Sequence, residues 1–143
     1  MRVTGRDPGY RNTMAKTAVA EVMTRRVVYL PSDTPLDEAA QVMRDQGIGD
    51  VVVTHGPTMA GMVTDRDIVV RAVADGLPMA TTTLETIATR EMIMVEQSAT
   101  VDEALQAMRD RGVRRLLVCD ADRKLVGIIS LSDLAMLPTS ASA

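Results

Sequence analysis

The chain has 143 residues, of which 46% are apolar and 24% charged, and its net charge is about −3. This length allows one ordinary domain, or two small units that share a core. The slight negative charge gives no basic field to attract nucleic acid or an anionic membrane, and two tyrosines without phenylalanine or tryptophan provide no platform for stacking bases. We therefore expect neither nucleic acid nor a membrane as a partner.

Cysteine and histidine each occur once, as Cys119 and His55, so no internal disulfide and no metal-ligand cluster is expected. The single cysteine excludes a disulfide scaffold, which favours a reducing cytoplasm. No apolar run approaches the roughly 20 residues that span a bilayer. Residues 1–17 lack the apolar region of a secretory signal, and we interpret them as a disordered leader in which Met14 is an alternative start. Residues 138–143 are predicted to be a disordered tail.

The first half of the chain alternates short apolar runs with a helical pattern. A short helix is expected at 18–23, and a strand at 27–30 that stops at Pro31. Thr34 fits an N-cap with Pro35 at the first helical position, and apolar residues at helical spacing follow until Gly47. Beyond Gly47 we predict a strand at 51–53 covered on both faces, a turn at 56–57, a strand at 59–63 and a helix at 65–74 that ends by Gly76.

The same order of elements recurs in the second half, after a linker at 78–83. A shift of 65 positions places Asp37-Glu38-Ala39 on Asp102-Glu103-Ala104, and Gly47 on Gly112. One extra residue in the second hairpin turn then places Asp67 on Asp133. The expected elements are helices at 84–88, 101–111 and 131–136, and strands at 93–95, 116–118 and 125–129.

This agreement indicates a duplication, with repeats at 18–77 and 78–137. Each repeat has three short strands and flanking helices, an α/β unit too small to bury both faces of its sheet alone. We therefore expect the two repeats to pack with pseudo-two-fold symmetry and to form twin clefts.

One seven-residue pattern occurs in both repeats, at 61–67 and 127–133. Each copy has a hydroxyl residue, Thr64 or Ser130, and a carboxylate three positions later, Asp67 or Asp133, where a helix begins. The N–H groups of a helix start suit phosphate, and a carboxylate can accept two hydrogen bonds from a ribose diol. The same spacing also fits a capping box that needs no ligand, and the pattern alone leaves both interpretations open.

The order of these motifs, used twice over about 18–136, resembles a tandem pair of cystathionine-β-synthase (CBS) domains, a Bateman module, of the stand-alone bacterial type. The resemblance rests on Val22-Met23-Thr24, the two helices that contain Asp-Glu-Ala, residues 112–118 and the two seven-residue patterns. The resemblance implies a homodimer that binds AMP, ADP or ATP in the cleft between repeats, and less often S-adenosylmethionine or NAD.

The resemblance also implies roles for individual residues. Asp67 and Asp133 would hold ribose hydroxyls, Thr64 and Ser130 would contact phosphate, and Arg114 and Arg115 match positions that often bind phosphate. These arginines align with Gly49 and Asp50 of the first repeat. Because Asp50 would repel a phosphate that Arg115 would attract, we favour the cleft at Ser130 and Asp133.

The sequence predicts a non-enzymatic sensor whose packing, within or between subunits, shifts on binding an adenine nucleotide, with an unknown protein partner reading the shift. The alternative is a ligand-free dimeric interaction or stress-response module with vestigial clefts. No catalytic residue, metal site or obligatory cofactor is predicted. Cys119 is interpreted as a core thiol and His55 as an exposed turn residue.

Overall fold

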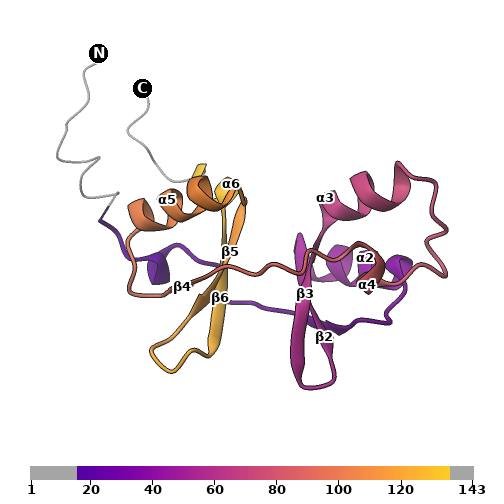
Figure 1. Ribbon diagram of the computed structural model, residues 1–143, viewed down its shortest axis with the longest axis horizontal. Coiled ribbons are helices and arrows are strands. Elements are labelled where there is room, and N and C mark those ends of the chain that lie inside the picture. The colour runs from indigo at the N-terminus through magenta and orange to yellow at the C-terminus, as the bar shows by residue number, and fades with distance from the viewer. Residues whose placement is uncertain (1–15, 136–143) are drawn as a thin grey trace, which may run out of the picture. The chain divides into compact units, whose positions relative to one another are not determined.

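The computed structural model describes residues 16–135, which form two three-stranded sheets with flanking helices (Figure 1). The chain divides into two compact units. The central unit is Val27–Met92, and the terminal unit combines the described residues up to Arg26 with those from Ile93 onward. The predicted α/β class, with one short mixed sheet and its helices in each half, is confirmed.

The central unit contains one sheet in the order β1-β2-β3. Strand β1 runs parallel to β2, and β2 pairs antiparallel with β3. Its elements are β1 (Tyr29–Pro31), α2 (Leu36–Gln46), β2 (Asp50–His55), β3 (Thr58–Thr64), α3 (Asp65–Asp67), the π-helix η2 (Ile68–Val73) and α4 (Leu84–Ile87).

The terminal unit repeats this topology in the order β4-β5-β6. Here β4 is parallel to β5, and β5 is antiparallel to β6. Its elements are the 3-10 helix η1 (Val19–Glu21), β4 (Met94–Glu96), α5 (Val101–Arg111), β5 (Arg115–Cys119), β6 (Leu125–Ser130) and α6 (Leu131–Ala135). None of the helices between residues 16 and 135 is long and apolar enough to cross a membrane.

In each unit the helices pack on one face of the sheet (Figure 1). Alternate strand residues lie in the core of each unit. Examples are Val51 and Val53 in the central unit, and Leu116 and Val118 in the terminal unit. Val52 lies between two core residues on its strand and therefore points to the opposite face, yet it is also fully buried. The prediction that this strand is covered on both faces is confirmed.

The two lead-in segments, residues 17–24 and 82–89, are exchanged relative to the order of the sequence. The first joins the terminal unit, where Val19 N–H donates to the Ala99 carbonyl and Thr24 forms a two-bond bridge with Ile128. The second joins the central unit through the equivalent bridge between Thr89 and Met62. The compact units therefore differ from contiguous repeats at 18–77 and 78–137, whose pseudo-two-fold relation stays a prediction.

The start of α2 differs from the prediction. Thr34 is not the N-cap: Pro35 is, and no side chain caps this helix. The Leu36 and Asp37 N–H groups donate instead to the carbonyls of Thr82 and Met79. The returning segment thus satisfies the first turn of α2, and Thr34 becomes a buried residue.

Most other boundaries follow the sequence. Gly47 and Gly112 end α2 and α5 in the left-handed region, each with φ of 65°, as predicted from their positions. Strands β1 and β4 lie one or two residues later than expected, and Pro31 falls inside β1 because an edge strand needs no N–H there. Cys119 is buried, as expected of a core thiol. The predictions for residues 1–15 and 138–143 lie outside the described residues.

Candidate ligand-binding sites

Both seven-residue patterns form capping boxes at the junction between a strand and a helix. In the central unit, Thr64 N–H donates to Asp67 Oδ2 at 2.9 Å, and Asp67 N–H donates to Thr64 Oγ1 at 3.0 Å. In the terminal unit, the equivalent bonds of Ser130 and Asp133 are 3.2 and 3.1 Å long. The structural interpretation of the spacing is therefore confirmed, and each box leaves Oδ1 of its carboxylate for other contacts.

The two carboxylates have different neighbours. Asp67 Oδ1 lies 3.8 Å from Arg71 Nε, one turn along the same helix. Arg71 Nη1 also donates to the Ile87 carbonyl and to Thr89 Oγ1, both at 3.0 Å. Sequence reasoning missed Arg71, although the four-residue spacing from Asp67 was a usable signal for an ion pair. Arg71 thus places a positive charge beside the first carboxylate.

The carboxylate of Asp133 keeps one oxygen unengaged. Within residues 16–135, no hydrogen bond or ion pair involves its Oδ1. By the 66-residue shift, the counterpart of Arg71 is Leu137, which has no charge to place there. The second junction therefore retains the acceptor that a ribose diol would need.

The strand register places Arg115 beside the second junction. Arg115 of β5 pairs directly with Ser130 of β6, so the two side chains lie on the same face of the sheet. In the central unit the same position opposite Thr64 is held by Asp50. A positive group beside one junction and a negative group beside the other is the asymmetry that the sequence alignment predicted.

Arg114 lies outside the sheet. It precedes β5, its side chain is exposed, and its carbonyl accepts from Leu131 N–H at 2.8 Å where α6 begins. Gly49 has the same role for Asp65 at the start of α3. Arg114 is thus tied to the second junction through its backbone, whereas Arg115 presents its side chain on the same face as Ser130.

The glycine that opens each pattern permits the close approach of a lead-in segment. A Cβ at Gly61 would lie 2.8 Å from the Thr89 carbonyl oxygen, and one at Gly127 would lie 2.7 Å from Met23 Sδ and 2.8 Å from the Thr24 carbonyl oxygen. All three distances are shorter than normal contacts allow, so the glycines serve packing rather than ligand contact. The hydroxyl and carboxylate residues remain as candidates for binding.

The structure thus groups the six predicted site residues into two sets. Thr64 and Asp67 lie together in the central unit, and the remaining four lie together in the terminal unit: Arg114, Arg115, Ser130 and Asp133. Ser130 is 6% exposed. No group of three or more histidine, cysteine, aspartate or glutamate side chains within residues 16–135 could hold a metal ion.

The protein-family model of the CBS domain matches this chain twice, at residues 19–73 and 84–138. The chain belongs to the CBS-domain family. It is 35% identical over 123 residues to an uncharacterized protein of Methanopyrus kandleri, covering 85% of this chain and 62% of that protein's length. It is 32% identical over 120 residues to the CBS domain-containing protein YhcV of Bacillus subtilis, covering 84% of each.

Solved structures share this CBS fold. A putative signal-transduction protein with CBS domains from Burkholderia ambifaria has a TM-score of 0.77 at 29% identity, covering 89% of this chain and 98% of that one. A CBS domain protein of Pyrobaculum aerophilum complexed with AMP has a TM-score of 0.70 at 29% identity, with coverage of 83% and 91%. Hypoxic Response Protein I, solved with two coordinated zinc ions, has a TM-score of 0.64 at 33% identity, with coverage of 83% and 97%.

Proposed function

We propose that this CBS pair is a non-enzymatic regulatory module that binds an adenine nucleotide of the AMP, ADP or ATP class, with its ribose at Asp133. The observation that carries the proposal is the unengaged Oδ1 of Asp133, whose Oδ2 accepts from the N–H of the buried Ser130. The AMP complex of the Pyrobaculum protein, which is similar over most of this chain, supports the choice of ligand class.

The proposal assigns a role to each group of the second junction. Asp133 Oδ1 accepts from the ribose hydroxyls, while Oδ2 keeps its bond to Ser130 N–H. Ser130 and the arginines at 114 and 115 bind the phosphate, where a guanidinium can donate two parallel hydrogen bonds. S-adenosylmethionine and NAD are less favoured because the arginines suit a terminal phosphate. Placement of the nucleotide between the repeats remains part of the proposal.

Binding would be read out through a change in how the two repeats or two subunits pack, because a ligand shifts an equilibrium only by its difference in affinity for the two states. The first junction is the weaker site. Arg71 already contacts Asp67, and Asp50 lies opposite Thr64, where it would repel phosphate.

A thermal-shift panel of AMP, ADP, ATP, NAD and S-adenosylmethionine tests the choice of ligand. At a hundredfold excess over Kd, a ligand adds about 2.7 kcal/mol to the free energy of unfolding, which raises Tm by roughly 5–10 °C for a chain of this size. We expect this rise for at least one of the three adenine mononucleotides. Unchanged melting across the whole panel would reject the nucleotide proposal.

A ligand-free interaction module is the second candidate, and two observations favour it. Both carboxylates are already satisfied in part by capping boxes, and Val69, Val70 and Val73 expose 58%, 49% and 57% of their surface on one helix. Such an apolar surface is typical of a contact between proteins. A stable dimer whose Tm is unchanged by every nucleotide in the panel would establish this alternative.

A further inference from the structure

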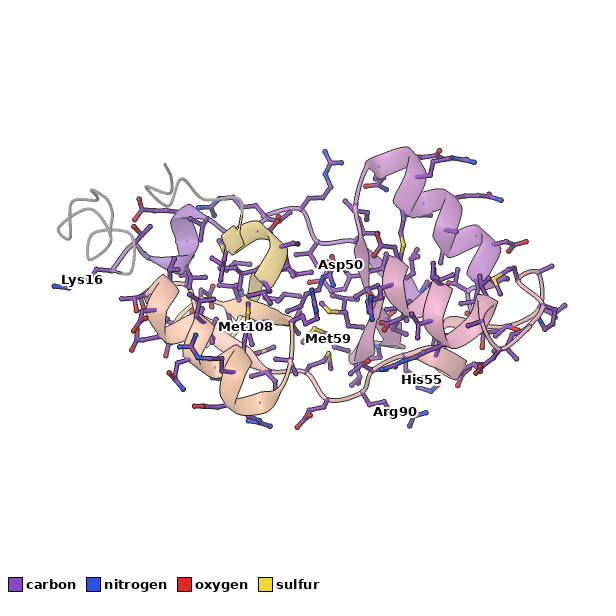
Figure 2. The ribbon with its side chains drawn as sticks, turned by 90° about the horizontal axis from the view of Figure 1, so that it is seen from above. Lys16, Asp50, His55, Met59, Arg90 and Met108 are labelled. Atoms are coloured by element: carbon purple, nitrogen blue, oxygen red, sulfur yellow. The ribbon has the colours of Figure 1, made fainter. Side chains whose placement is uncertain are left out.

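A pocket that contains no residue of either strand–helix junction lies within the central unit. Its volume is about 250 Å³. The turn after β1, the hairpin end of β2 and β3, and α4 with the residues after it supply its walls. The lining residues are Ser32, Val53, His55, Ala60, Glu85, Ala88 and Arg90. Figure 2 shows His55 and Arg90 close together at this edge of the unit.

The inner polar group of the pocket is the Ser32 hydroxyl. Ser32 is 8% exposed, and its Oγ lies 3.3 Å from His55 Nδ1. Its N–H donates to the Thr54 carbonyl, and its own carbonyl accepts from Glu85 N–H. The backbone of Ser32 is therefore fixed to both β2 and α4, and the hydroxyl has a defined position beside the imidazole.

The pocket also carries one charge of each sign. Glu85 and Arg90 are exposed, and within residues 16–135 neither side chain makes a hydrogen bond or ion pair. The remaining surface is apolar and comes from Val53, Ala60 and Ala88. A purely anionic ligand would meet Glu85 and a purely cationic one would meet Arg90, so a ligand that carries both charges fits best.

The terminal unit provides an internal comparison, because matched hydrogen bonds define equivalent residues. In the central unit, Glu85 N–H donates to the Ser32 carbonyl, and in the terminal unit Ala20 N–H donates to the Gln97 carbonyl. Ala20 is therefore the equivalent of Glu85, and the terminal unit has no carboxylate at this position. Met23 takes the place of Ala88 and reaches the strand glycine, with Sδ 2.7 Å from a Cβ built there.

Two further differences follow the same trend. Val126 precedes Gly127 where Ala60 precedes Gly61. Arg25, the counterpart of Arg90, donates to the Ala20 carbonyl at 3.1 Å. Larger side chains and a backbone-bound arginine thus occupy the equivalent region of the terminal unit. Three matched positions therefore differ in residue: Glu85 replaces Ala20, Ala88 replaces Met23, and Ala60 replaces Val126.

We propose that this pocket binds a free α-amino acid with a small apolar side chain. The carboxylate lies toward Arg90 and the Ser32 hydroxyl, the ammonium lies toward Glu85, and the side chain contacts Ala60 and Ala88. The volume of the pocket is below the roughly 300–1,000 Å³ of sites for drug-sized ligands, which suits a metabolite of this size. The site is independent of the proposed nucleotide site, since the two share no residue.

Isothermal titration calorimetry of the full chain with L-alanine, L-valine and L-leucine tests the site. We expect binding of at least one of them, and loss of binding for its N-acetyl derivative and its amide, each of which removes one charge. Glu85→Gln and Arg90→Gln should each weaken binding at least about tenfold, because each replaces a charge-assisted hydrogen bond by a weaker neutral one. Asp133→Ala should leave the affinity unchanged.

Ala88→Met fills the pocket with the residue that the terminal unit has at the same place, and should abolish binding. If that variant fails to fold, the two glutamine variants, whose sites are exposed, decide the matter. Chemical-shift changes of alanine methyl groups locate the ligand, and they should centre on Ala60 and Ala88. Absence of binding by all three amino acids, or binding that survives Glu85→Gln and Arg90→Gln unchanged, would overturn the proposal.

Discussion

At the scale of single residues, one arginine distinguishes the two strand–helix junctions. Asp67 and Asp133 have the same capping geometry, yet only Asp67 has a cation within 4 Å in the part of the chain that the structure describes. Arg71 also ties η2 to the lead-in segment through the Ile87 carbonyl and Thr89. It therefore contributes to the stability of the central unit and lies beside the carboxylate of Asp67.

Replacing this arginine tests its structural role. Arg71→Met keeps most of the aliphatic stem, and we expect it to lower the free energy of unfolding by about 1 kcal/mol, because two hydrogen bonds are lost and the half-exposed ion pair contributes little. Urea denaturation measures the change. Arg66→Met on the same helix is the matched control, since the Arg66 side chain makes no described contact. Equal stabilities of the two variants would contradict the role of Arg71.

The candidate site could be predicted from the sequence only in part. The repeated hydroxyl–carboxylate spacing identified Thr64, Asp67, Ser130 and Asp133. The alignment of Arg115 with Asp50 between the repeats identified the difference in charge between the two junctions. The pocket at Ser32 and Arg90 could not be found in this way. Its residues come from four separate segments, and none of them carries a local pattern of its own.

At the scale of elements, helix starts show how tertiary contacts replace local signals. Helix α5 begins with a capping box in which Glu103 N–H donates to Thr100 Oγ1 at 3.1 Å and Thr100 N–H donates to Glu103 Oε1 at 2.9 Å. At the equivalent position α2 has Pro35, and its first N–H groups are satisfied by the segment that returns at Met79 and Thr82. Thr34, which the sequence suggested as the cap, lies one residue too early.

The same substitution at both threonines tests this difference. Thr100→Val removes the capping oxygen and should lower the free energy of unfolding by about 1 kcal/mol. Thr34→Val removes a buried hydroxyl that no described hydrogen bond uses, so its effect should be near zero or stabilising. Chemical denaturation of the two variants measures both values. A larger loss for Thr34→Val would restore Thr34 as the functional cap of α2.

The exchange of lead-in segments could not be predicted from the sequence, for a physical reason. Residues 17–24 and 82–89 occupy equivalent positions in the duplication, and each can bridge a strand that carries a glycine, β3 at Gly61 or β6 at Gly127. Periodicity fixes which residues form each element, and it does so here for nearly all of them. It contains no information on which of two equivalent sheets each lead-in segment joins.

At the scale of the whole molecule, the exposed valines of η2 form an apolar surface patch. Val69 and Val73 lie four residues apart, so they share one face of the helix, and Val70 lies beside them. The family resemblance implies homodimers, and we propose that this face is part of the contact between two copies.

Sedimentation velocity at micromolar concentration tests the proposed dimer. The wild-type chain should sediment as a dimer, and Val69→Glu combined with Val73→Glu should produce monomers, because charges buried in an interface are costly. Ser98→Glu combined with Ala121→Glu adds the same charge at exposed positions and is the control. A wild-type monomer, or a dimer that persists in the valine variant, would contradict this contact.

We propose that an adenine nucleotide binds this chain through Asp133 and not through Asp67. Calorimetric titration with AMP of the wild-type chain, Asp133→Ala and Asp67→Ala tests it directly, because both variants lose an equivalent capping box and only one loses the proposed ribose acceptor. We predict that Asp133→Ala weakens AMP binding at least about tenfold, while Asp67→Ala stays close to wild type. The reverse order, or equal losses in both variants, would contradict nucleotide binding through Asp133.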